Sequence, residues 1–110
     1  MSADAKERIR ALNDRLRTTG LGGRVFITAG VEALGQALSA DALTAVRSFT
    51  VFTADNDPHD EHDFGVVHVA GCKLFWKIDY YDAAMVYGSE DPADPSVTTR
   101  VLTIMLAEEY

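Results

Sequence analysis

One stretch gathers the residues whose types and spacing could do chemistry. DNDPHDEHDFG, residues 55–65, holds five carboxylates and two histidines, and no Lys or Arg occurs from Ser48 to Cys72. A histidine beside an aspartate can act as a general base, and carboxylates with histidine can ligate a divalent cation. Asp and Asn are also strong turn formers. The stretch is therefore a candidate for catalysis, for metal binding, for docking a charged partner or for a structural turn.

Known metal signatures fit this stretch poorly. A calcium loop needs Gly at its sixth position and Glu at its twelfth, whereas a loop that starts at Asp55 has Asp60 and Val66 there. Neither a zincin motif nor paired cysteines occur, since Cys72 is the single cysteine. These absences argue against a calcium loop of that kind and against structural zinc.

A metal bound here would take ligands from two segments. If the chain turns back near Gly71, Asp63 faces the neighbourhood of Asp79 and His62 that of Tyr80. The predicted ligands are His62, Asp63 and Asp79. An oxygen-rich set of this kind favours magnesium, manganese or calcium over iron or zinc.

The open end of this hairpin is the predicted functional surface. Its docking or functional cluster comprises Asp55, Asp57, Glu61, His62, Asp63, Asp79, Tyr81 and Asp82. Like charges this close repel, so we expect relief by solvent and loop backbone, by Arg24, Lys77 or Arg100, or by a bound divalent cation. Asp57 before Pro58 suits a turn whose side chain caps nearby backbone N–H groups.

The sequence offers a candidate general base for metal-free catalysis but no recognisable nucleophile or substrate-binding motif. His62 with Asp63 or Asp79 could serve as a general base, but the sequence shows no nucleophile elbow, phosphate loop or dinucleotide fingerprint. We therefore assign no catalytic residue, and the sequence leans against an enzyme.

The totals describe one ordinary domain. A chain of 110 residues with 47% hydrophobic and 25% charged residues fits a single compact domain over residues 1–110. The start, MSADAKERIR, lacks the apolar core of a signal peptide, and no apolar run is long enough for a spanning helix. We expect a cytoplasmic protein without a membrane partner.

Charge is spread unevenly over the two halves. Residues 1–50 hold seven Lys or Arg against five Asp or Glu, whereas residues 51–110 hold three against twelve. An acidic second half repels phosphate backbones, which disfavours direct binding of nucleic acid. The same field suits a basic protein partner or a divalent cation. The oligomeric state stays open.

Hydrophobic periodicity predicts the elements that must position the acidic stretch. We expect an amphipathic helix over residues 3–17, a short strand over 24–28, and a second helix that is broken at first and firm from about Ser39 to Phe49. Residues 64–70 and 73–81 predict a hairpin. Its second strand turns one set of residues to the core: Leu74, Trp76, Ile78 and Tyr80.

The last third of the chain is predicted to close the fold with a helix. Asp94 reads as an N-cap with Pro95 in the first helical position, followed by apolar residues as far as Leu106, and residues 85–87 are a candidate edge strand. The fold class is α+β, with three helices packed on a small, mostly antiparallel sheet of three to four strands. The expected order is helix, strand, helix, strand, strand, helix.

Several strings resemble a known family over nearly the whole chain. They are RIRALND (8–14), DNDP and EHDFG in the acidic stretch, FWKIDYYD (75–82), DPADP (91–95) and TTRVLTIMLAEEY (98–110). They resemble the bacterial, mainly alphaproteobacterial, domain-of-unknown-function family numbered three-seven-six-eight, often found on plasmids and other mobile elements. The resemblance implies a stand-alone cytoplasmic bacterial domain and carries over no catalytic residue or ligand. Asp60 stands where that pattern leads us to expect glycine, which puts a tight turn with positive φ in question.

These observations favour a non-enzymatic protein-binding module that docks a basic partner at the hairpin end, with Tyr81 and Tyr87 as exposed aromatic contacts. A sharper version is a mobile-element accessory protein that inhibits a basic nucleic-acid-binding protein. The alternative is a divalent-metal-dependent enzyme or metal sensor that uses His62, Asp63 and Asp79. In a third interpretation, the cluster only fixes the loop.

Overall fold

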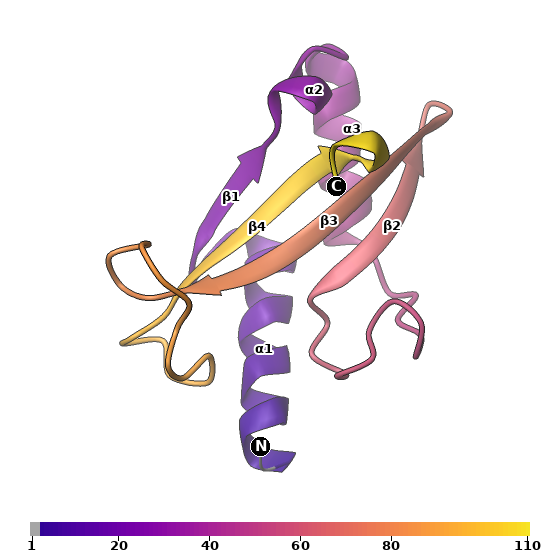
Figure 1. Ribbon diagram of the computed structural model, residues 1–110. Helices are drawn as coiled ribbons and strands as arrows, with labels where there is room; N and C mark the ends of the chain where they lie inside the picture. Colours follow the sequence, from indigo (N-terminus) through magenta and orange to yellow (C-terminus); the bar gives the residue numbers. More distant parts are fainter. Residues whose placement is uncertain (1–2) are drawn as a thin grey trace.

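The computed structural model describes residues 3–110. One four-stranded sheet, in the order β1-β4-β3-β2, carries the helices on one face (Figure 1). Its elements in chain order are α1 (Ala3–Thr19), β1 (Arg24–Ile27), α2 (Ala29–Glu32), α3 (Gln36–Arg47), β2 (Phe64–Val69), β3 (Cys72–Tyr81), β4 (Thr99–Leu106) and the 3₁₀ helix η1 (Ala107–Glu109). Among the described residues, no helix combines the length and the apolar character needed to cross a membrane.

The sheet is mostly antiparallel. β2 pairs antiparallel with β3, and β3 pairs antiparallel with β4, whereas β1 runs parallel to β4 at one edge. The β2–β3 hairpin turns through Ala70 and Gly71, whose φ angles are +50° and +81°. Two consecutive positive φ values are typical of the tight hairpin turn, and only glycine takes them without strain. The α+β class, with helices on a small, mostly antiparallel sheet, is confirmed.

The core lies between the helices and one face of the sheet. As predicted, alternation along β3 places Leu74, Trp76 and Ile78 in this core, and Tyr80 is partly buried beside it. The other buried side chains of the core come from every layer and comprise Leu16, Val31, Ala42, Val46, Phe49, Val67, Val69, Leu102 and Ile104. The helices thus fix the sheet, whose ends carry the loops of interest.

The two N-terminal predictions hold with small shifts. The first helix extends two residues beyond the predicted end, and the predicted strand 24–28 is β1. The predicted break in the second helical stretch separates α2 from α3 at Gly35, which has φ +105°. A non-glycine residue rarely adopts that backbone conformation. The glycine at this position therefore explains why the helical stretch is interrupted there.

The predicted closing helix was wrong. Residues 99–106 form the central strand β4, and the only helix after them is the three-residue η1. Asp94 caps a turn and not a helix, because its Oδ1 accepts hydrogen bonds from Ser96 N at 2.9 Å and Ser96 Oγ at 2.7 Å. A central strand buried on both faces reads as a continuous apolar run, which periodicity cannot distinguish from a buried helix.

The predicted edge strand at residues 85–87 was also wrong. This segment forms a turn closed by hydrogen bonds from Asp82 N to Tyr87 O at 2.7 Å and from Ser89 N to Tyr80 O at 3.0 Å. Only Gly88 makes a β-bridge, to Tyr81. The chain reverses too tightly there to lay a further strand on the sheet.

Candidate functional site

Asp57 organises the acidic loop from inside. Its buried carboxylate accepts hydrogen bonds from Glu61 N at 2.9 Å and from His62 N at 3.1 and 3.2 Å, while Asp57 N donates to Thr53 O at 2.8 Å. Both oxygens are thus taken up by backbone N–H groups. The turn predicted for Asp57 is confirmed, and this carboxylate supports the loop structurally.

Arg10 of α1 clamps the loop from outside. Its Nη2 lies 3.0 Å from Asp60 Oδ2, and its Nε donates to Asp60 O at 2.9 Å. Asp60 has φ +56°, so the positive φ is present although aspartate stands where glycine was expected. Asp and Asn tolerate this conformation better than other non-glycine residues.

His62 turns toward α1. Its ring stacks on Phe52 with centroids 3.7 Å apart, and its Nδ1 lies 2.8 Å from Asp14 Oδ1. A φ of +56° at His62 redirects the chain, so the next side chain, Asp63, points elsewhere. The predicted ligand set is therefore not brought together: His62 belongs to the α1 side, and Asp63 and Asp79 line a hollow on the β3 side.

A different trio meets the distance requirement for a metal. Within residues 3–110, Asp57, Asp60 and His62 are the His, Cys, Asp or Glu side chains that offer three ligand atoms within 4.8 Å of one another. Asp57, however, accepts backbone N–H groups with both oxygens, and Asp60 pairs with Arg10. The two aspartates of the trio therefore already have partners within the fold.

Glu61 belongs to a buried polar chain. Tyr80 donates its hydroxyl to Glu61 Oε1 at 3.0 Å, and Asn13 Nδ2 donates to Tyr80 Oη at 2.8 Å and to Glu61 O at 3.0 Å. Arg100 Nε donates to Asn13 Oδ1 at 2.9 Å. Burial raises the pKa of the Tyr80 phenol and lowers the pKa of the Arg100 guanidinium. This series of hydrogen bonds connects α1, the loop, β3 and β4.

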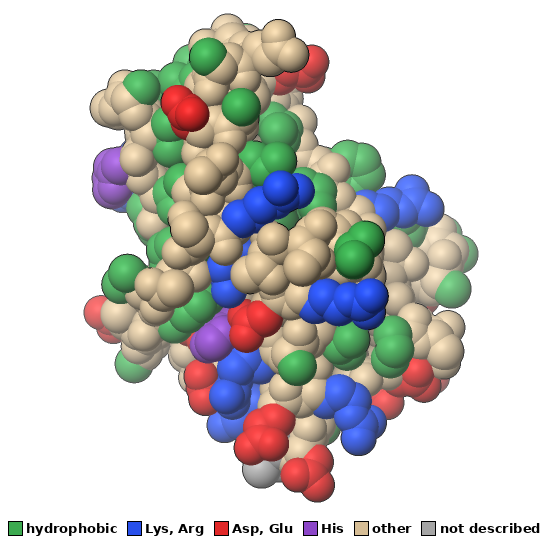
Figure 2. Space-filling view, turned by 180° about the vertical axis from the view of Figure 1, so that it is seen from behind, with side chains coloured by type: hydrophobic (Ala, Val, Ile, Leu, Met, Phe, Trp, Pro, Cys, Tyr) green, Lys and Arg blue, Asp and Glu red, His purple; other side chains and the backbone are tan. Residues whose placement is uncertain are grey.

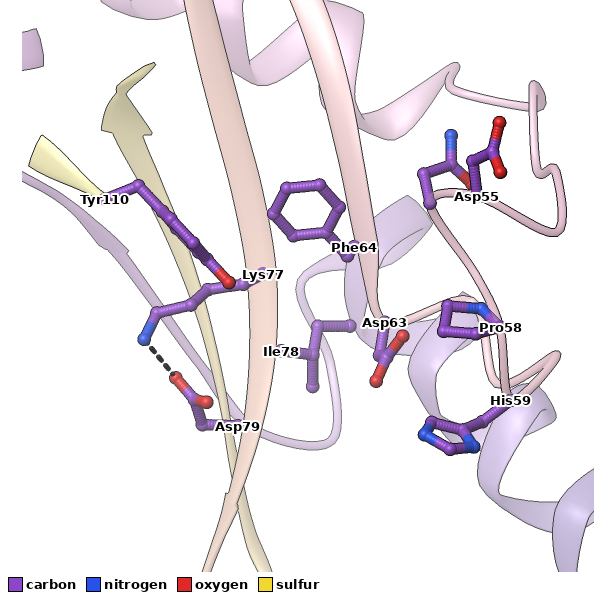
Figure 3. Close-up of a pocket in the computed structure, with 10 residues that line it drawn as sticks. Asp55, Pro58, His59, Asp63, Phe64, Lys77, Ile78, Asp79 and Tyr110 are labelled. Atoms are coloured by element: carbon purple, nitrogen blue, oxygen red, sulfur yellow. Dashed lines mark ion pairs between the residues drawn. The ribbon is translucent and has the colours of Figure 1, made fainter. Parts of the chain in front are cut away.

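Asp63 and Asp79 lie where the hairpin register predicts. Ile78 N donates to Asp63 O at 2.8 Å, one position from the expected pairing, and both carboxylates line the same hollow (Figure 3). Lys77 Nζ pairs with Asp79 Oδ2 at 3.0 Å. Burial, followed by the charges of Glu61 and Asp57, raises the pKa of the Asp63 carboxyl.

This acidic hollow has a volume of about 360 Å³. Figure 3 shows it between β3 and the loop, and its lining is Asp55, Asn56, Pro58, His59, Asp63, Phe64, Lys77, Ile78, Asp79 and Tyr110. Phe64 and Tyr110 are in edge contact, with ring centroids 5.7 Å apart. The hollow therefore combines three carboxylates, one lysine and an aromatic wall.

The remaining predicted residues lie outside the acidic hollow. Tyr81 pairs with Thr99 at the end of the sheet and is only partly exposed, and Asp82 Oδ1 caps the following turn by accepting from Val86 N at 3.0 Å. Tyr87 is exposed, as predicted. The predicted acids thus divide among the hollow (Asp55, Asp63 and Asp79), the adjoining loop interior (Asp57 and Glu61) and the turn after β3 (Asp82).

Sequence reasoning missed two of the partners that hold the loop. Asn13 and Asp14 lie in the family string RIRALND but were given no role, because they are far from residues 55–65 in the chain. Arg100 was expected as a partner of the acidic residues, and it reaches Glu61 only through Asn13. His59 and Tyr110 were also not assigned to the site, although both line the acidic hollow. The position of His59 inside the acidic stretch could have identified it as a residue of the site. Tyr110 reaches the hollow only because β4 returns beside β3.

The fold and the site define a small α+β domain with an acidic loop packed on its hairpin. Residues 27–109 match the model of the family described as "Protein of unknown function (DUF3768)", and this chain belongs to that family. The match confirms the family resemblance, although its range does not include α1, whose Arg10 and Asn13 hold the loop. No curated protein and no solved structure matches the chain.

Proposed function

We propose that this protein is a non-enzymatic binding module that docks a basic partner protein at the acidic hollow. One observation carries the proposal: Asp63 is a half-buried carboxylate in a concave site, and no Lys or Arg of the described residues forms an ion pair with it. A cationic side chain that entered the hollow would relieve the repulsion from Glu61 and Asp57.

The aromatic wall suits the same ligand. Phe64 and Tyr110 offer ring faces and edges beside the carboxylates, and a guanidinium or ammonium group gains from both carboxylates and aromatic rings. Tyr110 is 75% exposed, so a partner would bury much of it. Aromatic side chains buried in this way supply a large share of interface energy.

The charge pattern of the whole surface supports docking at this end. Figure 2 shows Lys and Arg side chains spread over the helical face. Every lining residue of the hollow lies within residues 51–110, which hold twelve Asp or Glu against three Lys or Arg. A basic partner is therefore steered toward the loops and away from the helices. A nucleic-acid-binding protein has this chemistry, because it presents Lys and Arg to phosphates. An inhibitor carried by a bacterial mobile element, acting in the cytoplasm, is the sharper form of the proposal.

Fluorescence anisotropy with a labelled arginine-rich peptide tests the docking site. The double variant Asp55→Asn/Asp63→Asn should bind about tenfold more weakly than the unmodified protein, which corresponds to about 1.4 kcal/mol. The matched control, Glu7→Gln/Asp41→Asn, removes two exposed carboxylates from the helical layer and changes the net charge equally. It should lose much less affinity. Equal losses in both variants would mean unspecific attraction and would refute the site.

A competition experiment addresses the inhibitor version. The same peptide is first bound to a labelled DNA duplex, and the protein is then added in excess. Release of the duplex by the unmodified protein, but not by Asp55→Asn/Asp63→Asn, is the expected result. Retention of the duplex despite measured peptide binding would reject inhibition by competition while leaving the docking site intact.

A further inference from the structure

We propose that β1 pairs with β1 of a second copy of this protein, antiparallel and about a two-fold axis at Phe26, so that two four-stranded sheets join into one. The surface involved is the free edge of the sheet, on the opposite side from β2. The proposal is independent of the docking function, because it uses none of the residues of the acidic hollow.

The outer edge of β1 has unpaired main-chain groups. Thr28 N donates to Ile104 O at 3.0 Å, so Arg24 and Phe26, at the same parity, turn their N–H and C=O groups toward β4. Val25 and Ile27 therefore turn theirs to the open edge. Among residues 3–110, no strand lies beyond β1 in the sheet. An unpaired edge of β-forming residues without Pro, Lys or a bulge is a template for another strand.

There is room for a strand beside this edge. A groove of about 630 Å³ is lined by Val25, Phe26 and Ile27 on the strand side and by Glu32, Gln36 and Ser39 on the helical side. An apolar wall on the strand side and a polar wall on the helical side fit an extended segment with alternating side chains. Figure 1 shows β1 as the outermost strand of the sheet on this side.

The edge is complementary to itself. The two outward-facing residues, Val25 and Ile27, lie symmetrically about Phe26. An antiparallel pairing centred there lets Val25 of each copy exchange hydrogen bonds with Ile27 of the other. Phe26 then faces its own symmetry mate in a non-hydrogen-bonded position, where side chains lie closest. The Phe26 side chain is 47% exposed, which is unfavourable for a large apolar side chain. The proposed pairing removes part of this apolar surface from water.

Charges also complement each other in this register. Arg24 and Glu32 are both exposed, and neither forms an ion pair within residues 3–110. Antiparallel pairing sets Arg24 of each copy opposite Thr28 of the other, where α2 begins and Glu32 lies at its end. The pairing thus brings Arg24 of each copy to the strand end from which α2, with Glu32 at its end, continues in the other copy. A second copy explains this match better than a foreign strand of arbitrary charge.

Sedimentation velocity of the full chain tests the proposal. A four-residue edge buries a small area, so we expect a dimer that forms between about 5 and about 500 µM. Phe26→Lys should remain monomeric, because two like charges meet on the axis. Val51→Lys, an equal change at another exposed apolar residue, should leave the dimer unchanged. A dimer that survives Phe26→Lys would overturn the proposed interface, as would a monomer at every concentration.

Charge reversal supplies a test that does not rely on a single variant. Arg24→Glu and Glu32→Arg should each weaken dimerisation by about tenfold, and the combined variant should restore it. In a Cys72→Ser background, Phe26→Cys should form an intermolecular disulfide on oxidation much faster than Val51→Cys. Melting curves confirm that each variant is folded. Additive losses in the double variant, or equal cross-linking at both cysteines, would exclude this register.

Discussion

Adjacent residues in the acidic stretch serve different surfaces. His62 packs on Phe52 and contacts Asp14 of α1, while Asp63 faces the hollow shared with Asp79. Both carboxylate oxygens of Asp57 accept hydrogen bonds from backbone N–H groups of the loop. The charges therefore stay together because most of them have a fixed structural partner, and Asp63 is the one left in a poorly solvated position without a cation.

That position predicts a stability cost at Asp63. Burial raises its pKa above the unfolded value of 3.8, so the native state disfavours the charged form. At neutral pH the charge lowers the free energy of unfolding. As the pH falls through the raised pKa, the native protein takes up the proton before the unfolded chain does, and the cost disappears. Asp63→Asn should therefore raise the melting temperature at neutral pH, and this gain should shrink toward zero below pH 3.8.

Melting curves over this pH range check the prediction, with the exposed Asp41→Asn as the control for net charge. The control should give a smaller gain. If Asp63→Asn also weakens peptide binding, the residue trades stability for binding, which is common at functional sites. A melting temperature lowered at neutral pH by Asp63→Asn would show that the carboxylate has a stabilising partner and would contradict the stated cause of its pKa.

At the scale of elements, Asn13 joins four parts of the fold. Its amide bonds Tyr80 of β3, Glu61 of the loop and Arg100 of β4 from a buried position on α1. Asn13→Ala would leave the Arg100 guanidinium and the Tyr80 hydroxyl short of partners. Because hydrogen bonds to buried charged groups are costly to lose, we expect the free energy of unfolding to fall by about 2–4 kcal/mol.

Denaturant unfolding measures this loss, with Arg15→Ala on the exposed side of α1 as the control. The control should change stability by no more than about 0.5 kcal/mol. A loss at Asn13 as small as that of the control would mean that water replaces the amide, and the polar chain would then not be what fixes α1 to the loop.

The elements that the sequence predicted well are those with one exposed face. α1 and β3 show clear periods because one side meets water, so their residue patterns report their conformation. β4 is buried on both sides, with Val101, Leu102, Ile104 and Met105 all inside, and its pattern carries no period. The predicted hairpin correctly placed Asp63 near Asp79. The direction of the His62 side chain, in contrast, depends on a positive φ at His62, which no sequence pattern predicts.

On the scale of the whole molecule, the two proposed surfaces lie at opposite edges of the sheet. β1 is the last strand on one side, and the acidic loop leads into β2 on the other. A dimer through β1 would therefore carry its two acidic hollows at the outer ends of one continuous sheet. Such a dimer could engage two cationic sites of one partner, and the second contact would gain from effective concentration.

The net charge of −7 predicts how salt acts on stability. Two opposing effects compete: salt weakens ion pairs such as Arg10–Asp60, and it screens repulsion among the excess carboxylates. The ion pairs are contacts of 3.0 Å, whereas the repulsion acts across a molecule of 39 × 30 × 23 Å. The Debye length is about 10 Å at 0.1 M salt, so repulsion at long range is screened more than contact pairs are.

We therefore expect sodium chloride to raise the melting temperature of this protein at neutral pH, because screening of self-repulsion outweighs the loss of exposed ion pairs, which contribute little. Calorimetry at low and high salt measures the effect. The same titration near pH 4.7, where the net charge vanishes, is the control and should show almost no rise. A melting temperature that falls with salt at neutral pH would mean that ion pairs such as Arg10–Asp60 and Lys77–Asp79 stabilise the loops more than the excess carboxylates destabilise them.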